Sequence, residues 1–343
     1  MTISKRSLLK GVGTAALASL VPAESQAAET PSSFRQAPVV GCRRVAASEA
    51  KADTAKVYFS RKIDAETLIR LYKLVNAGIT GKVGIKLHTG EKHGPNILPR
   101  DMVRAFQAQI PNSAIVECNT LYHGDRYTTK GHLETLKVNG WTFCPVDIMD
   151  ADDKYVDFPV KNGLRLKKVA MGAHLANYDS LVVLTHFKGH AMGGFGGSLK
   201  NIAIGCASGR VGKAEVHGVK PWSTDLDWGA MPMKDQFMEL MADSGKATCD
   251  HFGRHITFLN VMRRMSVDCD CAGTSAAEPT IPDIGILAST DILAIDQASC
   301  DLVYGSGHNH DLVERMESRH GLAQLDAMRR NRMGASTYRL IEI

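Results

Sequence analysis

The sequence predicts an α/β fold with a mainly parallel β-sheet, helices on both faces of the sheet and a helical insertion. Strand-like apolar runs alternate along the chain with segments of helical periodicity, an order typical of parallel sheets. One of these runs, "SLVVLTH" at 180–186, contains a continuous apolar stretch from Leu181 to Leu184, as strands covered on both faces do. Residues 218–267 break the alternation with a long amphipathic segment, and we interpret them as an insertion or a helical subdomain.

Local sequence patterns place the elements in order. Glycine or proline bounds three of the helices: Gly78 ends the first, Pro99 begins the second and Gly140 follows the third. Apolar runs of strand type predict strands at 56–60, 82–88, 114–119, 180–186, 283–289 and 337–343. Helical periodicity predicts helices at 65–78, 99–108, 129–138 and 292–303, and one or two helices within 310–330.

The composition is that of an ordinary globular protein. Of the 343 residues, 44% are hydrophobic and 22% are charged, enough for one large domain or two smaller ones. The formal net charge of +5 includes no block of like charges, and it gives no argument for nucleic-acid binding. We therefore expect no nucleic-acid partner, and the sequence does not address the oligomeric state.

The start of the chain predicts export. Residues 1–27 have the parts of a signal peptide: the basic "SKRSLLK", a short apolar stretch from Gly11 to Val21, and "SQA" before Ala28. The basic part resembles a twin-arginine export signal with Lys5 in place of the first arginine, and ordinary secretory export stays open. We expect a periplasmic or other extracytoplasmic protein with no stable membrane span after cleavage, beginning with a linker or irregular arm over 28–52.

Polar residues follow several of the predicted strands. Ligands of open parallel sheets bind beyond the carboxyl ends of the strands, so we expect these residues to share a site. Lys86 and His88 lie on one face at the end of 82–88, Glu117 ends the next strand, and Asp291 follows 283–289, where it could instead cap a helix. Any one of these residues could simply lie in an ordinary polar loop. The presence of polar residues at the ends of several strands favours a shared catalytic site.

The densest polar segment is "THFKGHAMGGFGGSLKN" at 185–201. Continued as a strand, it places His186, Lys188 and His190 on one face, which offers two imidazoles for metal ligation or proton transfer beside a cation. Ser198 could cap a following helix whose N-terminus would favour an anion. Glycines allow close approach of a cofactor here, or simply a tight packing loop: Gly193, Gly194, Gly196 and Gly197.

The next segment argues against a nucleotide site. "ASGRVGKA" at 207–214 resembles a P-loop, but Ala207 replaces its first glycine and Ala214 replaces the hydroxyl residue that holds magnesium. Strand alternation over "GKAEVH" would place Lys213, Glu215 and His217 on one face, either facing the site or on a solvated edge strand.

"VDCDC" at 267–271 carries two of the eight cysteines. In an extended segment Cys269 and Cys271 face one way, and Asp268 and Asp270 face the other. Their Cα atoms would lie about 6.6 Å apart, two strand rises, which is near the upper limit for a disulfide. Metal or redox use, disulfides to other cysteines and inert buried thiols all remain open. Two thiolates do not complete a metal site, so further ligands would come from His186, His190, His217 or Cys206.

Several segments together resemble the domain of unknown function family 362, over most of the chain from Val57 onward. They are "GIKLHTGE", "VECNTLYHGDRYTTKGHLET", the run from "VVLTHFKGH" to "GKAEVH", and "VDCDC" with "PDIGILASTDILAIDQASCDLV". The resemblance implies an α/β domain over 53–343 with Lys86, His88, Glu117, His186, Lys188, His190 and Lys200 near one site. Many members carry a ferredoxin-like cysteine module after the position of His217. Here Cys249 is the only cysteine before Cys269, so that module is absent.

Together these features predict an exported metal-dependent or redox enzyme that acts on a small anionic substrate. Cys269 and Cys271 would bind zinc, iron or an iron–sulfur cluster, with His186, His190 or His217 as further ligands or proton carriers. Lys86, Lys188 and Lys200 would hold the anion. Two alternatives are a non-catalytic binding protein for a small anionic ligand or metal, and a structural protein whose cysteines are bridged.

Overall fold

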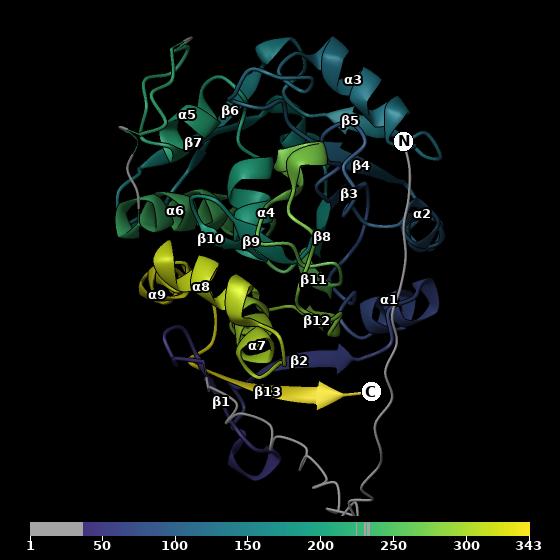
Figure 1. The fold of residues 1–343 in the computed structure, drawn as a ribbon, viewed down its shortest axis with the longest axis vertical. Coiled ribbons are helices and arrows are strands. Elements are labelled where there is room, and N and C mark those ends of the chain that lie inside the picture. The colour runs from purple at the N-terminus through teal and green to yellow at the C-terminus, as the bar shows by residue number, and fades with distance from the viewer. Residues whose placement is uncertain (1–36, 224, 230, 232–233) are drawn as a thin grey trace, which may run out of the picture. The chain divides into compact units, whose positions relative to one another are not determined.

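A mostly parallel sheet of nine strands forms the centre of the structure, a computed structural model that describes residues 37–343 except 224, 230, 232 and 233 (Figure 1). The predicted signal peptide lies outside these residues. In order across the sheet the strands are β1 (Arg43–Arg44), β13 (Thr337–Glu342), β2 (Ala55–Ser60), β12 (Gly285–Ser289), β11 (Ile256–Met262), β8 (Ser180–His186), β3 (Val83–Lys86), β4 (Ser113–Glu117) and β5 (Val146–Ile148). All neighbours are parallel except β12, which is antiparallel to both β11 and β2.

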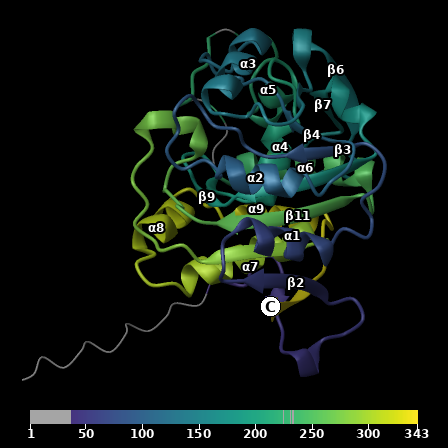
Figure 2. The same ribbon diagram turned by 90° about the vertical axis from the view of Figure 1, so that its right-hand side faces the viewer.

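Helices cover both faces of this sheet, which confirms the predicted fold class (Figure 2). One face carries α1 (Ala65–Lys73), α2 (Arg100–Gln107) and α3 (Thr129–Val138); the other carries α4 (Ser198–Gly205), α6 (Asp235–Phe252), α7 (Ile292–Tyr304) and α9 (Ala323–Arg330). Smaller elements complete the described chain: α5 (Gly212–Val216), α8 (His310–Ser318), and the hairpin pairs β6 (Tyr155–Pro159) with β7 (Lys168–Gly172) and β9 (Lys188–His190) with β10 (Gly194–Gly196).

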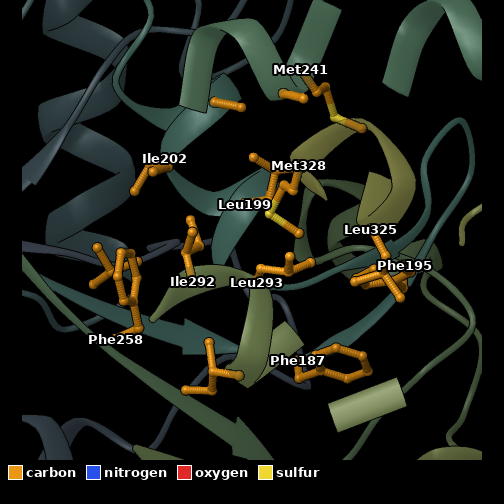
Figure 3. Packing of buried hydrophobic residues seen from close by; sticks show 14 of the residues in the cluster. Phe187, Phe195, Leu199, Ile202, Met241, Phe258, Ile292, Leu293, Leu325 and Met328 are labelled. Carbon is orange, nitrogen blue, oxygen red and sulfur yellow. The ribbon is translucent and has the colours of Figure 1, made fainter. Parts of the chain in front are cut away.

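The side chains of β8 explain why this strand reads as one apolar run. Leu181 and Val183 belong to the core under α4, α6 and α7, while Val182 and Leu184 belong to the core under α1 and α2. Figure 3 shows part of the first core, where Leu199 and Ile202 of α4 pack near Met241 of α6. Since both faces are buried, period-two alternation is lost, as expected for a central parallel strand.

Local capping sets several element ends where the sequence predicts them. Thr128 accepts a hydrogen bond from the Gly131 amide at the start of α3, and Gly140 follows its end with a φ of +80°, which favours glycine. Asp291 caps α7 by accepting from the Ala294 amide at 2.8 Å. The helix predicted at 65–78 is shorter than expected and ends at Lys73, and residues 310–330 form two helices.

Two expectations about the organisation of the chain are wrong. Residues 218–267 are not wholly an insertion or helical subdomain, because β11 at their end is a central strand. The "GKAEVH" segment forms α5 and not a strand. In the described part of the predicted 28–52 linker or irregular arm, β1 pairs with β13 and Cys42 is buried.

No helix in the described residues combines the length and the apolar character needed to cross a bilayer.

Candidate functional site

A cavity of about 380 Å³ lies where β3, β4 and β8 end and α4 begins. Most of the residues predicted for the site line it: Lys86, His88, Glu117, His186, Lys188, His190, Gly196, Gly197, Lys200, His217 and Cys271. Three of the four predicted strand ends therefore meet. The fourth does not. Strand β12 is antiparallel to its neighbours, so its carboxyl end at Ser289 lies beside the amino end of β11. Asp291, which follows it, is a helix cap.

Lys86 is fully engaged within the protein. Its ammonium group donates to the Leu87 carbonyl at 2.9 Å, to Glu117 Oε2 at 2.8 Å and to Asn201 Oδ1 at 3.1 Å. These three acceptors use all three of its protons, and the side chain is 1% exposed. A Cβ at Gly205 would lie 2.1 Å from Lys86 Cε, so a larger residue there would force the Lys86 side chain to shift. Lys86 joins β3 to α4 and has no proton left for the substrate role that the sequence predicted.

Glu117 is likewise a structural carboxylate. Its Oε1 accepts from the Thr89 amide at 2.9 Å, and its Oε2 accepts from Lys86. Burial opposes the charge, but Lys86, His88 and Arg126 outweigh it and hold the pKa of Glu117 well below its usual range. Glu117 is therefore ionised and paired within the protein, which favours a structural role over the predicted place among the catalytic residues.

His186 and Lys188 meet on Asp270, which the sequence placed on the opposite side from the cysteines. Asp270 accepts from His186 Nδ1 at 3.0 Å and from Lys188 Nζ at 2.8 Å. The other ring nitrogen of His186 contacts the Arg263 carbonyl at 2.7 Å. Both ring nitrogens of His186 therefore have partners within the protein. His186 is not in the group of described residues that could hold a metal ion, and in this arrangement it positions Asp270.

Asp270 is the main site residue that sequence reasoning missed. Burial opposes its charge, but His186 and Lys188 hold its pKa well below the usual range. The segment is not extended as predicted: Cys269 begins a short 3₁₀ turn over Asp270–Ser275, and the Ala272 amide donates to the Cys269 carbonyl. This turn brings Asp270 and both cysteines toward the cavity, while Asp268 faces Arg315.

Cys269 is surrounded by hydrogen-bond donors. Lys200 Nζ lies 3.3 Å from its sulfur, and Cys271 and His88 also hydrogen-bond to it. The Gly90 amide donates to His88 Nδ1 at 3.0 Å, so the proton of that ring is on Nε2, the nitrogen free to donate to sulfur. The Cys271 hydrogen bond, then Lys200 and His88, lower the pKa of Cys269 well below its ordinary value despite burial. Conversely, the same hydrogen bond and burial raise the pKa of Cys271, so the pair holds one thiolate and one thiol.

His190, Cys269 and Cys271 form a group that could hold a metal ion. One ligand atom from each lies within 4.8 Å of the other two. His217, a predicted ligand, is not in this group: its Nδ1 contacts the Lys213 carbonyl at 2.6 Å, and its ring packs on Trp228 and Phe237. Burial lowers the pKa of His217 to about 4, so the ring is neutral at neutral pH.

The single lone pair of His190 is already used. The Gly193 amide donates to His190 Nδ1 at 2.9 Å, and burial, then the charge of Lys200, lowers the pKa of His190 to about 3. A metal needs a lone pair on one ring nitrogen. It would either displace the Gly193 amide from Nδ1 or move the ring proton onto Nδ1, against that amide. Metal binding by His190 therefore breaks this hydrogen bond in either case.

The glycine loop divides into parts with different roles. Gly193 orients His190, and Gly194, at a φ of +75°, packs against Gly321. Gly196 and Gly197 line the cavity. A Cβ at Gly197 would lie 2.5 Å from Asp296 Oδ1, the group that occupies the N-terminus of α4.

The predicted anion site at the start of α4 is filled by the protein itself. Asp296 of α7 accepts from the amides of Ser198 and Leu199 at 2.8 and 2.9 Å. The Ser198 hydroxyl contacts Asn260 and does not cap the helix, so that expectation is wrong. Burial raises the pKa of Asp296 to about 6.

All eight cysteines lie in the described part of the chain, and none is disulfide-bonded there. Cys206, another predicted candidate ligand, is buried and outside the metal-binding group.

Comparison with known proteins gives a family and distant structural similarities. The family model described as domain of unknown function (DUF362) matches residues 83–301, more than half of the chain. The lactate racemase apoprotein from Thermoanaerobacterium thermosaccharolyticum is similar at 12% identity and a TM-score of 0.42, over 74% of this chain and 58% of that one. A protein from Thermotoga maritima is similar at 10% identity and a TM-score of 0.42, over 71% and 59%. The alignment thus spans less than two thirds of either structure, and no curated protein matches the sequence.

Proposed function

This chain belongs to the family described as domain of unknown function (DUF362), and for this member we propose an enzyme that binds a transition metal and acts on a small anionic substrate. The observation that carries the proposal is the convergence of His190, Cys269 and Cys271 within 4.8 Å of one another. Lys188 and Lys200 line the adjoining cavity. Soft ligands and ammonium groups therefore face the same small space.

The ligand set favours a single zinc or iron ion. Two sulfurs and one imidazole leave a coordination position open, as in catalytic and unlike structural zinc sites. A cluster normally takes four protein ligands, and this group in the described residues supplies three. When bound, such an ion would polarise a substrate oxygen or lower the pKa of a water molecule.

The surrounding residues would prepare the sulfurs and the substrate. Lys200 and the Nε2 proton of His88 stabilise the Cys269 thiolate before any metal arrives. Asp270 fixes Lys188 through a 2.8 Å ion pair. Lys188 and Lys200 each retain protons for an anionic group, because each has one acceptor among the described residues.

Elemental analysis of protein isolated without oxygen tests the metal. We expect about one zinc or iron per chain, at least tenfold weaker binding in His190→Ala, and loss of the metal in Cys269→Ser/Cys271→Ser. Cys144→Ser is the matched control, because Cys144 lies outside the group and should not affect metal content. Metal-free native protein, or unchanged metal content in the double variant, would contradict the proposal.

A redox dithiol is a second candidate, favoured by the thiolate at Cys269 beside the thiol of Cys271. Oxidation of this thiolate–thiol pair would form one S–S bond, pass two electrons to an acceptor such as a quinone or a second disulfide, and release the one proton of the Cys271 thiol. Metal-free protein that reversibly loses two hydrogen atoms at these cysteines would favour this function over the first. Tight ligand binding without turnover over a metabolite panel would favour the non-catalytic binding protein.

We also propose that the protein is exported, on the basis of residues 1–27. Fractionation of cells should then recover a mature chain that begins at Ala28 outside the cytoplasm. A full-length chain in the cytoplasm would contradict export.

A further inference from the structure

We propose that the cavity binds a small dicarboxylate, with one carboxylate at Lys188 and Lys200 and the other at Lys213. The inference deepens the proposed function, and it rests on that function only in taking the cavity as the substrate site. Two carboxylates are expected from the buried lysines whose ammonium groups can still donate hydrogen bonds to a ligand.

The first pole of the cavity is the pair Lys188 and Lys200. Their side chains flank Gly196, where an added Cβ would lie 3.7 Å from Lys200 Cδ and 3.9 Å from Lys188 Cε. Lys188 pairs with Asp270 and Lys200 with Cys269, so each ammonium keeps donors for a further partner. A carboxylate has two oxygens and can accept from both ammonium groups at once.

The second pole is Lys213 on α5, the helix that follows α4 in the chain, and it also lines the cavity. Its ammonium donates to the Ala207 carbonyl at 2.7 Å, and no carboxylate of the described residues forms an ion pair with it. The residue is 5% exposed. A buried ammonium without a counter-ion is costly, and an anionic ligand would remove that cost.

The electrostatics of Lys213 agree with this role. Burial lowers its pKa, and Cys118, Asp150 and Glu117 oppose this effect only in part. Lys86, by contrast, has the Glu117 carboxylate at 2.8 Å. A ligand carboxylate would supply to Lys213 what Glu117 supplies to Lys86.

The spacing of the poles suits a short chain with a charge at each end. Lys200 lies in the first turn of α4, which ends at Gly205. Ala207, whose carbonyl accepts from the Lys213 ammonium group, follows just after the end of this helix. Seven residues at helical rise span on the order of 10 Å along the helix axis. Apolar side chains line the cavity and would contact the methylene groups: Leu121, Met192, Ile204 and Trp228.

Calorimetric titration tests the proposal with matched ligands. Succinate, glutarate and adipate are each compared with the monocarboxylate of the same carbon number: butyrate, pentanoate and hexanoate. We expect at least one dicarboxylate to bind tenfold or more tightly than its match. Lys213→Met should abolish that preference and leave monocarboxylate binding unchanged, whereas Lys200→Met should weaken both ligands.

Two further variants control for folding and charge. Lys213→Arg keeps the cation and should retain the preference for two carboxylates. Lys168→Met removes an exposed lysine that pairs with Asp157 and should change nothing. Equal affinity for the matched ligands in the wild type would overturn the proposal. So would an unchanged preference in Lys213→Met, or its loss in Lys213→Arg that remains folded.

The titrations are run on metal-loaded and on chelator-treated wild-type protein. Lys213 is not in the metal-binding group. The preference for dicarboxylates, which depends on Lys213, should therefore appear in both the metal-loaded and the chelator-treated protein. A protein that holds no metal but shows this preference would defeat the proposed metal site alone. A protein that holds the metal without the preference would defeat the dicarboxylate alone.

Discussion

Two walls of one cavity differ in how many hydrogen-bond acceptors surround their buried lysines. On the wall formed by the ends of β3 and β4, Lys86 and Glu117 satisfy each other, and every Lys86 proton has an acceptor. On the wall formed by α4 and α5, Lys200 and Lys213 each have one acceptor among the described residues, and neither of these acceptors is a carboxylate. Lysines on both walls are buried. Burial and charge alone therefore do not distinguish the lysines of the two walls; the number of acceptors that each ammonium group already has does.

The largest expected effect tests the satisfied wall. Lys86→Met leaves the buried Glu117 carboxylate without its main partner, and we expect a loss of about 3–5 kcal/mol in the free energy of unfolding. Lys213→Met deprives no carboxylate of an ion pair, so it should cost less than about 1 kcal/mol or stabilise the protein. Urea unfolding of the metal-free proteins measures both.

Lys86→Met/Glu117→Gln should recover part of the loss, because the amide at 117 carries no charge to be buried. The comparison between the two walls fails if Lys86→Met and Lys213→Met destabilise the protein equally.

A smaller effect concerns Asp296, where backbone amides and not a cation hold the carboxylate. Burial raises its pKa to about 6 in the folded protein, above the value near 3.9 expected when unfolded. The folded state therefore binds more protons between these values, and stability from this group falls as the pH rises from about 4 to 6. At 1.36 kcal/mol for each pKa unit, the fall is roughly 3 kcal/mol.

Denaturant unfolding across this pH range measures the effect as the difference between wild type and Asp296→Asn, which cannot titrate. The difference should change with pH in the stated direction. A difference that is constant from pH 4 to 6 would refute the assignment to Asp296.

The smallest expected effect concerns one hydrogen bond at the proposed metal site, the one from the Gly193 amide to His190 Nδ1. If metal binding takes the His190 lone pair, the Gly193 amide loses its acceptor and should exchange with solvent faster in the metal-loaded protein. The Leu199 amide is the internal control, because Asp296 holds it in both forms. Hydrogen exchange at single-residue resolution measures both amides. Equal Gly193 exchange with and without metal would mean that His190 is not a ligand.

Much of the site was within reach of the sequence, because parallel strands bring their carboxyl ends to one edge. That rule is enough to group His88, Lys188 and His190, which do line one cavity. The rule placed Asp291 wrongly, because the sequence of an apolar run such as "DIGILAS" does not indicate whether the strand is parallel or antiparallel to its neighbours. Strand β12 is antiparallel to both. Asp270 was missed because strand alternation was assumed where the chain makes a 3₁₀ turn.

The sequence by itself determined the fold class, most helix and strand positions, and the residue types that gather at the strand ends. These follow from local periodicity and capping, as with α3, whose bounds at Thr129–Val138 match the prediction. Only the tertiary structure decided which of those residues are engaged. Lys86, Lys200 and Lys213 are the same amino acid in one cavity. What separates them is the acceptor that each ammonium group meets in the fold. Glu117 and Cys269 come from other parts of the chain, whereas the Ala207 carbonyl lies six residues before Lys213.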